Sequence, residues 1–274
     1  MPELPEAESI CRALSRAITG AVITGVEIFS PRMRSSLLGL PDAQLSGRRI
    51  TRVRRRGRYV CADLDDMRTI LMHFGMSGVV RVEDASIPRR KHEHVFLHFE
   101  DGRILRFECT RRFSLFEVHA LPAVDAWPSV LADLGPEPLT DEFSGAYLFR
   151  VSRQRRTPVK VLLMDNRFVC GIGNIYAAEI LFASGVSPLR PAGELSAGEC
   201  ERIAADAKRI LCRAIELGGT TVSDFKNVDG SEGKFVQELR MYGCKGGECP
   251  VCQTKIAEVR LGGRSSCYCP ECQK

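Results

Sequence analysis

Four cysteines near the C-terminus restrict the fold more than any other feature of the sequence. Cys249 and Cys252 form one C-x-x-C pair, Cys269 and Cys272 form another, and 16 residues separate the two pairs. Pairs at this spacing are typical of a zinc ribbon, in which two tight turns present four thiolates to one ion. A module of about 35 residues buries too little apolar surface to fold alone, so the metal would supply folding energy. The tail therefore predicts one structural Zn2+, with four unligated thiols as the alternative.

Two further cysteines, Cys244 and Cys267, lie close to these pairs. Cys267 is only two residues from Cys269, a spacing that suits a zinc knuckle poorly, so both are left out of the predicted ligand set. Two glycines and then Arg264 precede the second pair, and this hairpin could hold a phosphate or be a plain turn. The other six cysteines are expected to be small core residues or free thiols: Cys11, Cys61, Cys109, Cys170, Cys200 and Cys212.

Basic residues are concentrated in one segment. The net charge is +5, and residues 48–58 contain seven arginines, with no acidic residue between Asp42 and Asp63. Most charge runs form a solvated face, but this density favours a surface for a polyanion. No apolar run reaches the roughly 18 residues of a membrane span, and the first residues do not resemble a secretory signal. We therefore expect a cytoplasmic protein that does not bind a membrane.

The patterning predicts an α+β protein with several domains. Apolar residues at helical spacing predict a helix over 6–18, and short β-branched runs between 22 and 118 predict an antiparallel β-sandwich. Further helices are expected from Asn174 and after Ser196, which forms a capping box with Glu199. The predicted limits are 1–125 for the β-sandwich domain, 126–150 for a linker, 151–238 for a helical domain and 239–274 for the zinc ribbon.

Several short motifs allow two interpretations. The G-x-G before Asn174 lacks the third glycine of a dinucleotide site, so it indicates an anion cradle, with Asn174 as a helix cap or a phosphate ligand. Met76 is expected in the core near a turn. Phe113 is expected to be buried beside a surface arginine, although an extended backbone would make Arg111 and Phe113 an intercalating pair.

Taken in order, many segments resemble the bacterial formamidopyrimidine-DNA glycosylase family over nearly the whole chain. The segments are PELPEAES, HFGMSG, KHEHV, RRFS, LGPEPL, MDNRFVCGIGNIYAAEILFASGVSP, GGTTVSDF, DGSEGKFVQELRMYG and the cysteine ribbon with GRSS. The resemblance implies an N-terminal β-sandwich with flanking helices, a helix–two-turn–helix domain and a C-terminal four-cysteine zinc ribbon. It implies a monomer that binds double-stranded DNA containing oxidised bases or abasic sites, associated with a bacterial nucleoid.

The resemblance assigns catalytic roles to Pro2, Glu3, Glu6, Arg58 and Arg264. The family's nucleophile is an N-terminal proline, here Pro2 after removal of the initiator methionine. An α-amino group with a pKa of roughly 7.7–8.0 is partly neutral near pH 7 and can attack the sugar. Glu3 matches the acid–base carboxylate and Glu6 a supporting one. Without the resemblance, both are simply acids favoured at a helix N-terminus.

DNA-binding roles are implied for a second set of residues. Met76, Arg111 and Phe113 resemble the side chains that fill the gap when a base is flipped out. Residues 222–235 resemble a loop that covers the flipped base. The remaining implied contacts, at phosphates near the lesion, involve His73, Lys160, Asn174, Tyr242 and Arg264.

The sequence departs from the family pattern at several positions. Arg58 replaces a lysine, which keeps the charge but removes an amine that could lose its proton. Cys109 and Thr110 replace an Asp-Pro pair, Ser114 replaces a glycine, and Lys234 replaces an aromatic residue. The changes at Cys109, Thr110 and Ser114 could alter how the intercalating loop is held, and the change at Lys234 could alter lesion preference.

Three functions are compatible with these observations. The leading one removes oxidised purines, such as 8-oxoguanine and formamidopyrimidines, through a proline Schiff base and then cleaves the strand by β,δ-elimination. An endonuclease VIII-like glycosylase for oxidised pyrimidines is the second, and Leu4 together with the R-x-F segment favours the purine enzyme over it. The third is a zinc protein that binds damaged DNA without catalysis, which the intact PELPE segment argues against.

Overall fold

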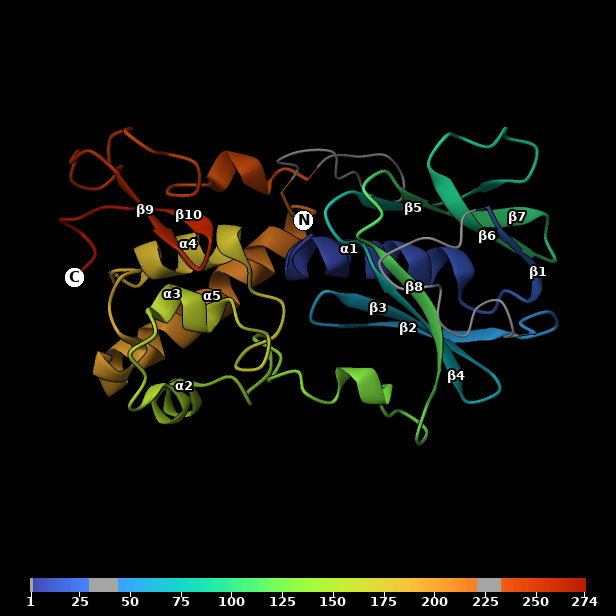
Figure 1. Ribbon diagram of the computed structural model, residues 1–274, viewed down its shortest axis with the longest axis horizontal. Coiled ribbons are helices and arrows are strands. Elements are labelled where there is room, and N and C mark those ends of the chain that lie inside the picture. The colour runs from blue at the N-terminus through green and yellow to red at the C-terminus, as the bar shows by residue number, and fades with distance from the viewer. Residues whose placement is uncertain (1, 30–43, 221–232) are drawn as a thin grey trace. The chain divides into compact units, whose positions relative to one another are not determined.

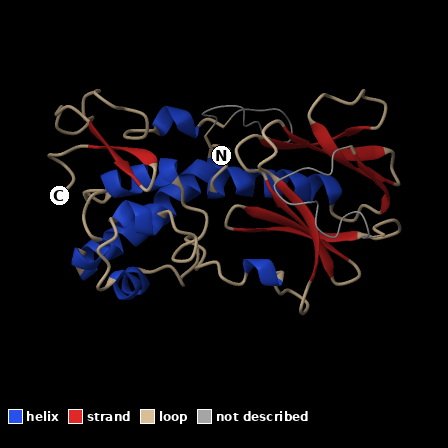
Figure 2. Ribbon diagram, in the orientation of Figure 1, coloured by secondary structure: helices blue, strands red, loops and turns tan. Residues whose placement is uncertain are grey.

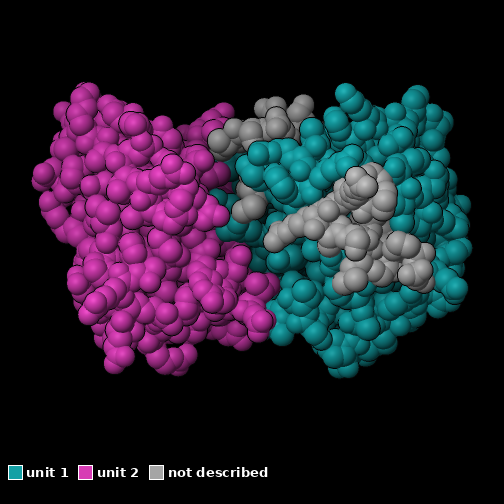
Figure 3. Space-filling view, viewed as in Figure 1, with its two compact units in different colours: residues 1–132, 218–234 teal, residues 133–217, 235–274 magenta. Residues whose placement is uncertain are grey.

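The computed structural model describes residues 2–29, 44–220 and 233–274. Two compact units divide the chain (Figure 3). Unit 1 comprises residues 1–132 and 218–234, and unit 2 comprises residues 133–217 and 235–274. The domain limits inferred from composition stay a prediction, and most of the expected lesion-covering loop, residues 222–232, lies outside the described part.

Unit 1 begins with helix α1 (Leu4–Ile18). Its apolar residues recur at helical spacing, and Ile10, Leu14 and Ile18 are all buried in the core of the unit. The expected helix was correct, but it begins two residues earlier, because Pro5 suits the first turn, where its missing N–H needs no partner. After the helix, Gly20 has a φ of +87°, a conformation that glycine adopts without strain.

The β-sandwich prediction is confirmed by two four-stranded antiparallel sheets (Figures 1 and 2). The first has the order β1 (Ile23–Ile28), β6 (Glu93–Phe99), β7 (Arg103–Cys109) and β5 (Gly78–Asp84). The second has the order β2 (Ile50–Arg56), β3 (Tyr59–Leu64), β4 (Arg68–His73) and β8 (Leu115–Ala120). α1 contacts strands of both sheets, so its buried face completes their shared core.

The arginine-rich segment lies mainly on β2, and Arg54 and Arg55 pair with residues of unit 1 itself. Arg54 binds Asp63 at 2.7 Å, and its guanidinium lies 4.0 Å from the ring centre of Trp127. Arg55 binds Glu8 at 2.8 Å. The interpretation of the run as a polyanion surface is therefore wrong for these members. Their partners lie on other elements, which a count of nearby acids in the sequence does not detect.

Unit 2 is helical and carries the C-terminal ribbon. Its helices are α2 (Gly145–Ser152), α3 (Val159–Leu163), α4 (Asn174–Ala183) and α5 (Ala197–Glu216), with 3-10 turns at Ala192–Glu194 and Phe235–Glu238. The connection between α4 and α5 contains one turn at 187–190 and then the 3-10 turn at Ala192–Glu194, which confirms the helix–two-turn–helix expectation. Strands β9 (Ala257–Leu261) and β10 (Arg264–Tyr268) form the ribbon hairpin. Among the described residues, no helix combines the length and apolarity needed to cross a membrane.

The capping box of α5 supports a first prediction, on stability and pH. Glu199 accepts hydrogen bonds from the Ser196 backbone and from Arg190. Burial raises the pKa of Glu199, but the Arg190 and Ser196 hydrogen bonds outweigh it and lower the pKa from 4.5 to about 2. The stability that ionised Glu199 adds to the folded state is therefore complete above pH 4.5 and is lost as the pH falls toward 2.

We expect Glu199→Gln to lower the free energy of unfolding by about 1–2 kcal/mol at pH 7, since a charge-assisted cap is lost. Urea unfolding at pH 7 and pH 3 would measure this difference, which should shrink at the lower pH. Glu201→Gln, an exposed position on the same helix, is the control. An equal loss at both pH values would contradict the assignment.

Candidate functional site

Two buried carboxylates organise the start of α1. Glu3 and Glu6 are 4% and 1% exposed, and they form a capping box in which the Glu3 N–H donates to Glu6 Oε2 at 2.8 Å. Glu6 Oε1 accepts from the backbone N–H of Thr220 at 2.7 Å and from its hydroxyl at 3.1 Å. Gly219 passes so close that an added Cβ would lie 2.6 Å from Glu6 Oε1. Both acids therefore fix the helix start that carries Pro2, which is itself buried.

Arg58 and His73 lie at neighbouring ends of β3 and β4 in unit 1. Arg58, 8% exposed, precedes Tyr59, which pairs with His73 across β3 and β4. The Tyr59 and His73 rings lie 4.8 Å apart, and His73 Nδ1 accepts the N–H of Gly75 at 3.2 Å. An ion pair between Arg55, near the end of β2, and Glu8, in the second turn of the helix, connects this sheet to α1.

Met76 and Phe113 protrude from two loops of unit 1. Their exposed fractions are 44% and 51%, so the expectations of a core methionine and a buried phenylalanine were wrong. Arg112 has a φ of +57°, so the segment turns instead of running extended. The turn still keeps Arg111 and Phe113 together, with the guanidinium 5.7 Å from the ring centre. The two loops thus present an arginine, an aromatic ring and a methionine to solvent.

In unit 2, the start of α4 carries Asn174. The helix cap is Gly173, so the expectation that Asn174 caps the helix was wrong. Among the described residues, Asn174 Oδ1 is buried without a hydrogen-bond partner. The N–H of Gly171 donates to Asn166 Oδ1 at 3.1 Å, so this N–H of the expected anion cradle is already used.

Glu179 holds the segment that leads from the 3-10 turn into the ribbon. This carboxylate, 5% exposed on α4, accepts the backbone N–H groups of Arg240, Met241 and Tyr242 at 2.8–3.0 Å. It therefore fixes the backbone position of Tyr242. Sequence reasoning missed Glu179, although a lone acid within the apolar stretch NIYAAEILF is a signal, because such residues are rarely buried unless paired. It also missed Thr220, for which the sequence offers no comparable signal.

Lys160 contacts the ribbon hairpin that carries Arg264. Arg264 is exposed at the first position of β10. Lys160 is 0% exposed, and its ammonium donates to Ser266 Oγ at 2.9 Å and to the Ser265 carbonyl at 3.5 Å. A side chain buried in this way holds the hairpin and does not face solvent, so the geometry does not favour the expected direct DNA contact of Lys160.

The four predicted zinc ligands converge. Their Sγ atoms all lie within 4.8 Å of one another, with Cys249 and Cys272 at 3.8 Å and Cys252 and Cys269 at 3.4 Å. Zn–S bonds of about 2.3 Å in a tetrahedron put the sulfurs about 3.8 Å apart, so this set fits one Zn2+. With four thiolate ligands the ion is structural, and it joins two knuckles without taking part in chemistry.

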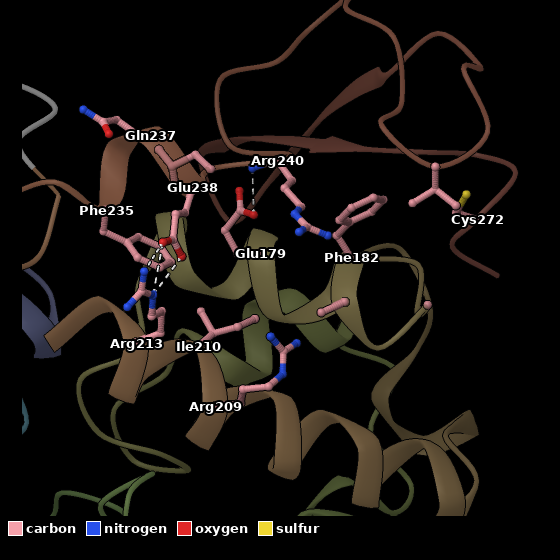
Figure 4. A pocket seen from close by; sticks show the side chains of 14 residues that line it. Glu179, Phe182, Arg209, Ile210, Arg213, Phe235, Gln237, Glu238, Arg240 and Cys272 are labelled. Carbon is pink, nitrogen blue, oxygen red and sulfur yellow. Dashed lines mark hydrogen bonds and ion pairs between the residues drawn. The ribbon is translucent and has the colours of Figure 1, made fainter. Parts of the chain in front are cut away.

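A cavity of about 610 Å3 lies in unit 2 between α4, α5, the 3-10 turn at Phe235–Glu238 and the ribbon (Figure 4). Two of its arginines are neutralised, since Arg213 binds Glu238 at 2.7 Å and Arg209 binds Asp206 at 2.7 Å. None of the residues predicted to act in catalysis lines it. The predicted chemistry therefore lies elsewhere, at the N-terminal end of α1.

Comparison with known proteins places this geometry in a family. Three sequence families match successive parts of the chain: the formamidopyrimidine-DNA glycosylase N-terminal domain over 1–116, its H2TH domain over 134–226, and a zinc finger found in FPG and IleRS over 246–274. Formamidopyrimidine-DNA glycosylases of Teredinibacter turnerae and of a Pseudomonas putida strain are each 43% identical, with 100% of both chains covered.

Solved structures agree with this placement. The chain is similar to Lactococcus lactis Fpg in complex with DNA containing an abasic site, with a TM-score of 0.89, 29% identity and 99% of both chains covered. It is also similar to MutM in complex with DNA containing carbocyclic 8-oxo-G, with a TM-score of 0.90, 31% identity and 100% of both chains covered. The chain belongs to the formamidopyrimidine-DNA glycosylase family.

Proposed function

We propose that this protein is a base-excision repair enzyme that removes oxidised purines from duplex DNA and then cleaves the strand at the abasic site. The observation that carries the proposal is the match to formamidopyrimidine-DNA glycosylases along their whole length. It acts as a monomer on DNA containing 8-oxoguanine, formamidopyrimidines or abasic sites, in the cytoplasm and in association with a bacterial nucleoid.

The proposed nucleophile is Pro2, once Met1 has been removed. Its neutral amine attacks C1′ of the damaged nucleotide, the C1′–N bond breaks, and the base leaves with the bonding electrons and takes up a proton. The attached amine then loses its proton, the C1′–O4′ bond breaks as O4′ takes up a proton, and the iminium cation that forms withdraws electrons from the opened sugar. This acidifies the neighbouring C–H, so that the 3′ and then the 5′ phosphate leave by β,δ-elimination.

The neighbouring residues have distinct proposed roles. Glu3 exchanges protons with the sugar and the leaving base, and Glu6 holds the backbone next to the nucleophile through its bond to the Glu3 N–H. Arg58 stays protonated at every physiological pH, so it can bind a phosphate but cannot act as a base. Arg264 on the ribbon hairpin binds a phosphate beside the lesion and so keeps the sugar in place for reaction.

The remaining proposed contacts are those that the family resemblance implies. Met76, Arg111 and Phe113 would fill the space that a flipped base leaves, which their exposed positions on two loops allow. His73, Asn174 and Tyr242 would contact phosphates next to the lesion. Lys160, in contrast, would act through the hairpin that it supports.

A substrate comparison tests the proposed function. Duplexes with 8-oxoguanine opposite cytosine and duplexes with an oxidised pyrimidine would be incubated with the protein under single-turnover conditions. We expect release of 8-oxoguanine and strand cleavage, with much slower release of the pyrimidine. The reverse order would favour the endonuclease VIII-like alternative. Tight binding without release of either base would favour a non-catalytic protein.

The salt dependence of DNA binding separates the roles of Arg264 and Lys160. Each phosphate contact that is lost should lower the slope of log K against log salt by about 1. We expect Arg264→Ala to lower the slope by this amount. Lys160→Met should weaken DNA binding by displacing the hairpin. Its slope of log K against log salt should fall by no more than the change that Arg264→Ala causes. A fall in the slope for Lys160→Met when Arg264 is already alanine would show that Lys160 contacts a phosphate itself.

A further inference from the structure

We propose that Ser77 and Ser114 are positioning residues whose hydroxyl groups join the two loops carrying Met76, Arg111 and Phe113 into one preformed wedge. The inference rests on the proposed function, because the wedge acts only when a base is flipped from DNA. Neither serine needs to touch DNA for this role. Each acts on the backbone of the loop opposite its own.

Ser114 makes the first tie. It is 0% exposed, and its hydroxyl donates to the carbonyl oxygen of Phe74 at 2.8 Å. The same oxygen accepts the N–H of Gly78 at 2.7 Å, which closes the turn that contains Met76. The second loop is therefore bonded to the atom on which the first loop closes. Neither alanine nor glycine at this position could form the bond.

Ser77 makes the second tie in the opposite direction. Ser77 is 6% exposed, and its hydroxyl oxygen accepts the backbone N–H of Arg111 at 3.1 Å. Between the two ties the loops touch directly, because a Cβ added at Gly75 would lie 2.5 Å from the Phe113 carbonyl oxygen. Gly75 also has a φ of +56°, so two separate constraints require glycine there.

The two ties give the wedge a rigid backbone and exposed side-chain tips. The backbone of both loops is fixed by one buried and one partly buried hydrogen bond, while the Met76 and Phe113 side chains remain about half exposed. A wedge held in place before DNA arrives loses less conformational entropy on insertion than two independent loops would. The ties should therefore favour insertion into the base stack, and they should matter little for DNA in which the target base is already absent.

The test uses the full-length protein and the variants Ser114→Ala, Ser77→Ala and the double variant. Insertion would be followed by the fluorescence of 2-aminopurine placed next to 8-oxoguanine, together with the single-turnover rate of base release. We expect each single variant to slow both signals by roughly five- to tenfold, the factor that one net hydrogen bond represents. Affinity for a duplex with an abasic-site analogue should change less than twofold.

A matched control separates positioning from general loss of stability. Ser152 in unit 2 is also 0% exposed, and its hydroxyl donates to the Phe149 carbonyl at 3.0 Å. Ser152→Ala should lower thermal stability by a similar amount and leave the insertion rate unchanged. If Ser152→Ala slows insertion as much as Ser114→Ala does, or if the two loop variants insert at the wild-type rate, the proposal is wrong.

Hydrogen exchange in the free protein gives a readout that needs no DNA. The Arg111 amide should exchange faster in Ser77→Ala, which lacks its acceptor, and the Gly78 amide faster in Ser114→Ala. Unchanged exchange at both amides would overturn the ties. Failure of the proposed function would look different, since the wild-type protein itself would release no base while the exchange differences persisted.

Discussion

Protein that retains Met1 is expected to form no covalent adduct with DNA and to lose base release by at least about a thousandfold, the scale on which loss of a covalent nucleophile acts. An amide nitrogen at Pro2 has no basic lone pair, so it cannot attack the sugar or form an iminium ion. Borohydride reduction during reaction with an 8-oxoguanine duplex would trap the iminium, and the adduct would migrate slowly on a denaturing gel. Mass spectrometry of each preparation would establish the state of its N-terminus.

Pro2→Gly with a free terminus is the informative control. It keeps an α-amino group, whose pKa of roughly 7.7–8.0 leaves a neutral fraction at pH 7, so a slower but detectable adduct should form. Below pH 7, adduct formation should slow further as the amine becomes protonated. An adduct of equal yield in protein that retains Met1 would instead show that another amine, the Met1 α-amino group or a lysine, acts as the nucleophile. If neither the protein that retains Met1 nor the Pro2→Gly variant formed an adduct, the reaction would require the proline ring itself.

Features of the fold that depend on neighbours in the sequence could be predicted. The capping box of Ser196 and Glu199 and the helical spacing of Ile10, Leu14 and Ile18 are local patterns, and the structure reproduces them. The zinc site was predictable for a related reason, since each knuckle is a short local turn and only the joining of the two is long-range.

Contacts between distant segments could not be predicted in the same way. Glu6 and Thr220 lie 214 residues apart in the chain, and no local pattern relates them. Arg54 and Arg55 were expected to serve a polyanion, but partners from α1 and β3 neutralise them. The exposure of Met76 and Phe113 was also missed, because both are apolar and nothing in their local sequence indicates that the side chains face solvent.

Removal of the zinc ion has the second large expected effect, because the ribbon has little core of its own. Beyond the cysteines, its buried apolar cluster consists of Ile256, which precedes β9, of Met241, and of Phe182, which lies on α4. Structural zinc in small fingers contributes an apparent 10–16 kcal/mol or so of folding free energy. Without the ion, the hairpin that carries Arg264 should therefore unfold, while unit 1 should stay folded on its own core.

Cys272→Ser tests this expectation against Cys212→Ser, a change at an exposed free cysteine of the same unit. We expect the first variant to lose its bound zinc and to bind DNA on the order of tenfold or more weakly, since one charge-assisted hydrogen bond contributes about 1.5–3 kcal/mol. The second variant should match the wild type. Metal analysis, circular dichroism and DNA titration would measure these effects. If the Cys272 variant kept one zinc ion and full affinity, a neighbour such as Cys244 or Cys267 would have to replace the missing thiolate, and the closed four-cysteine site would be wrong.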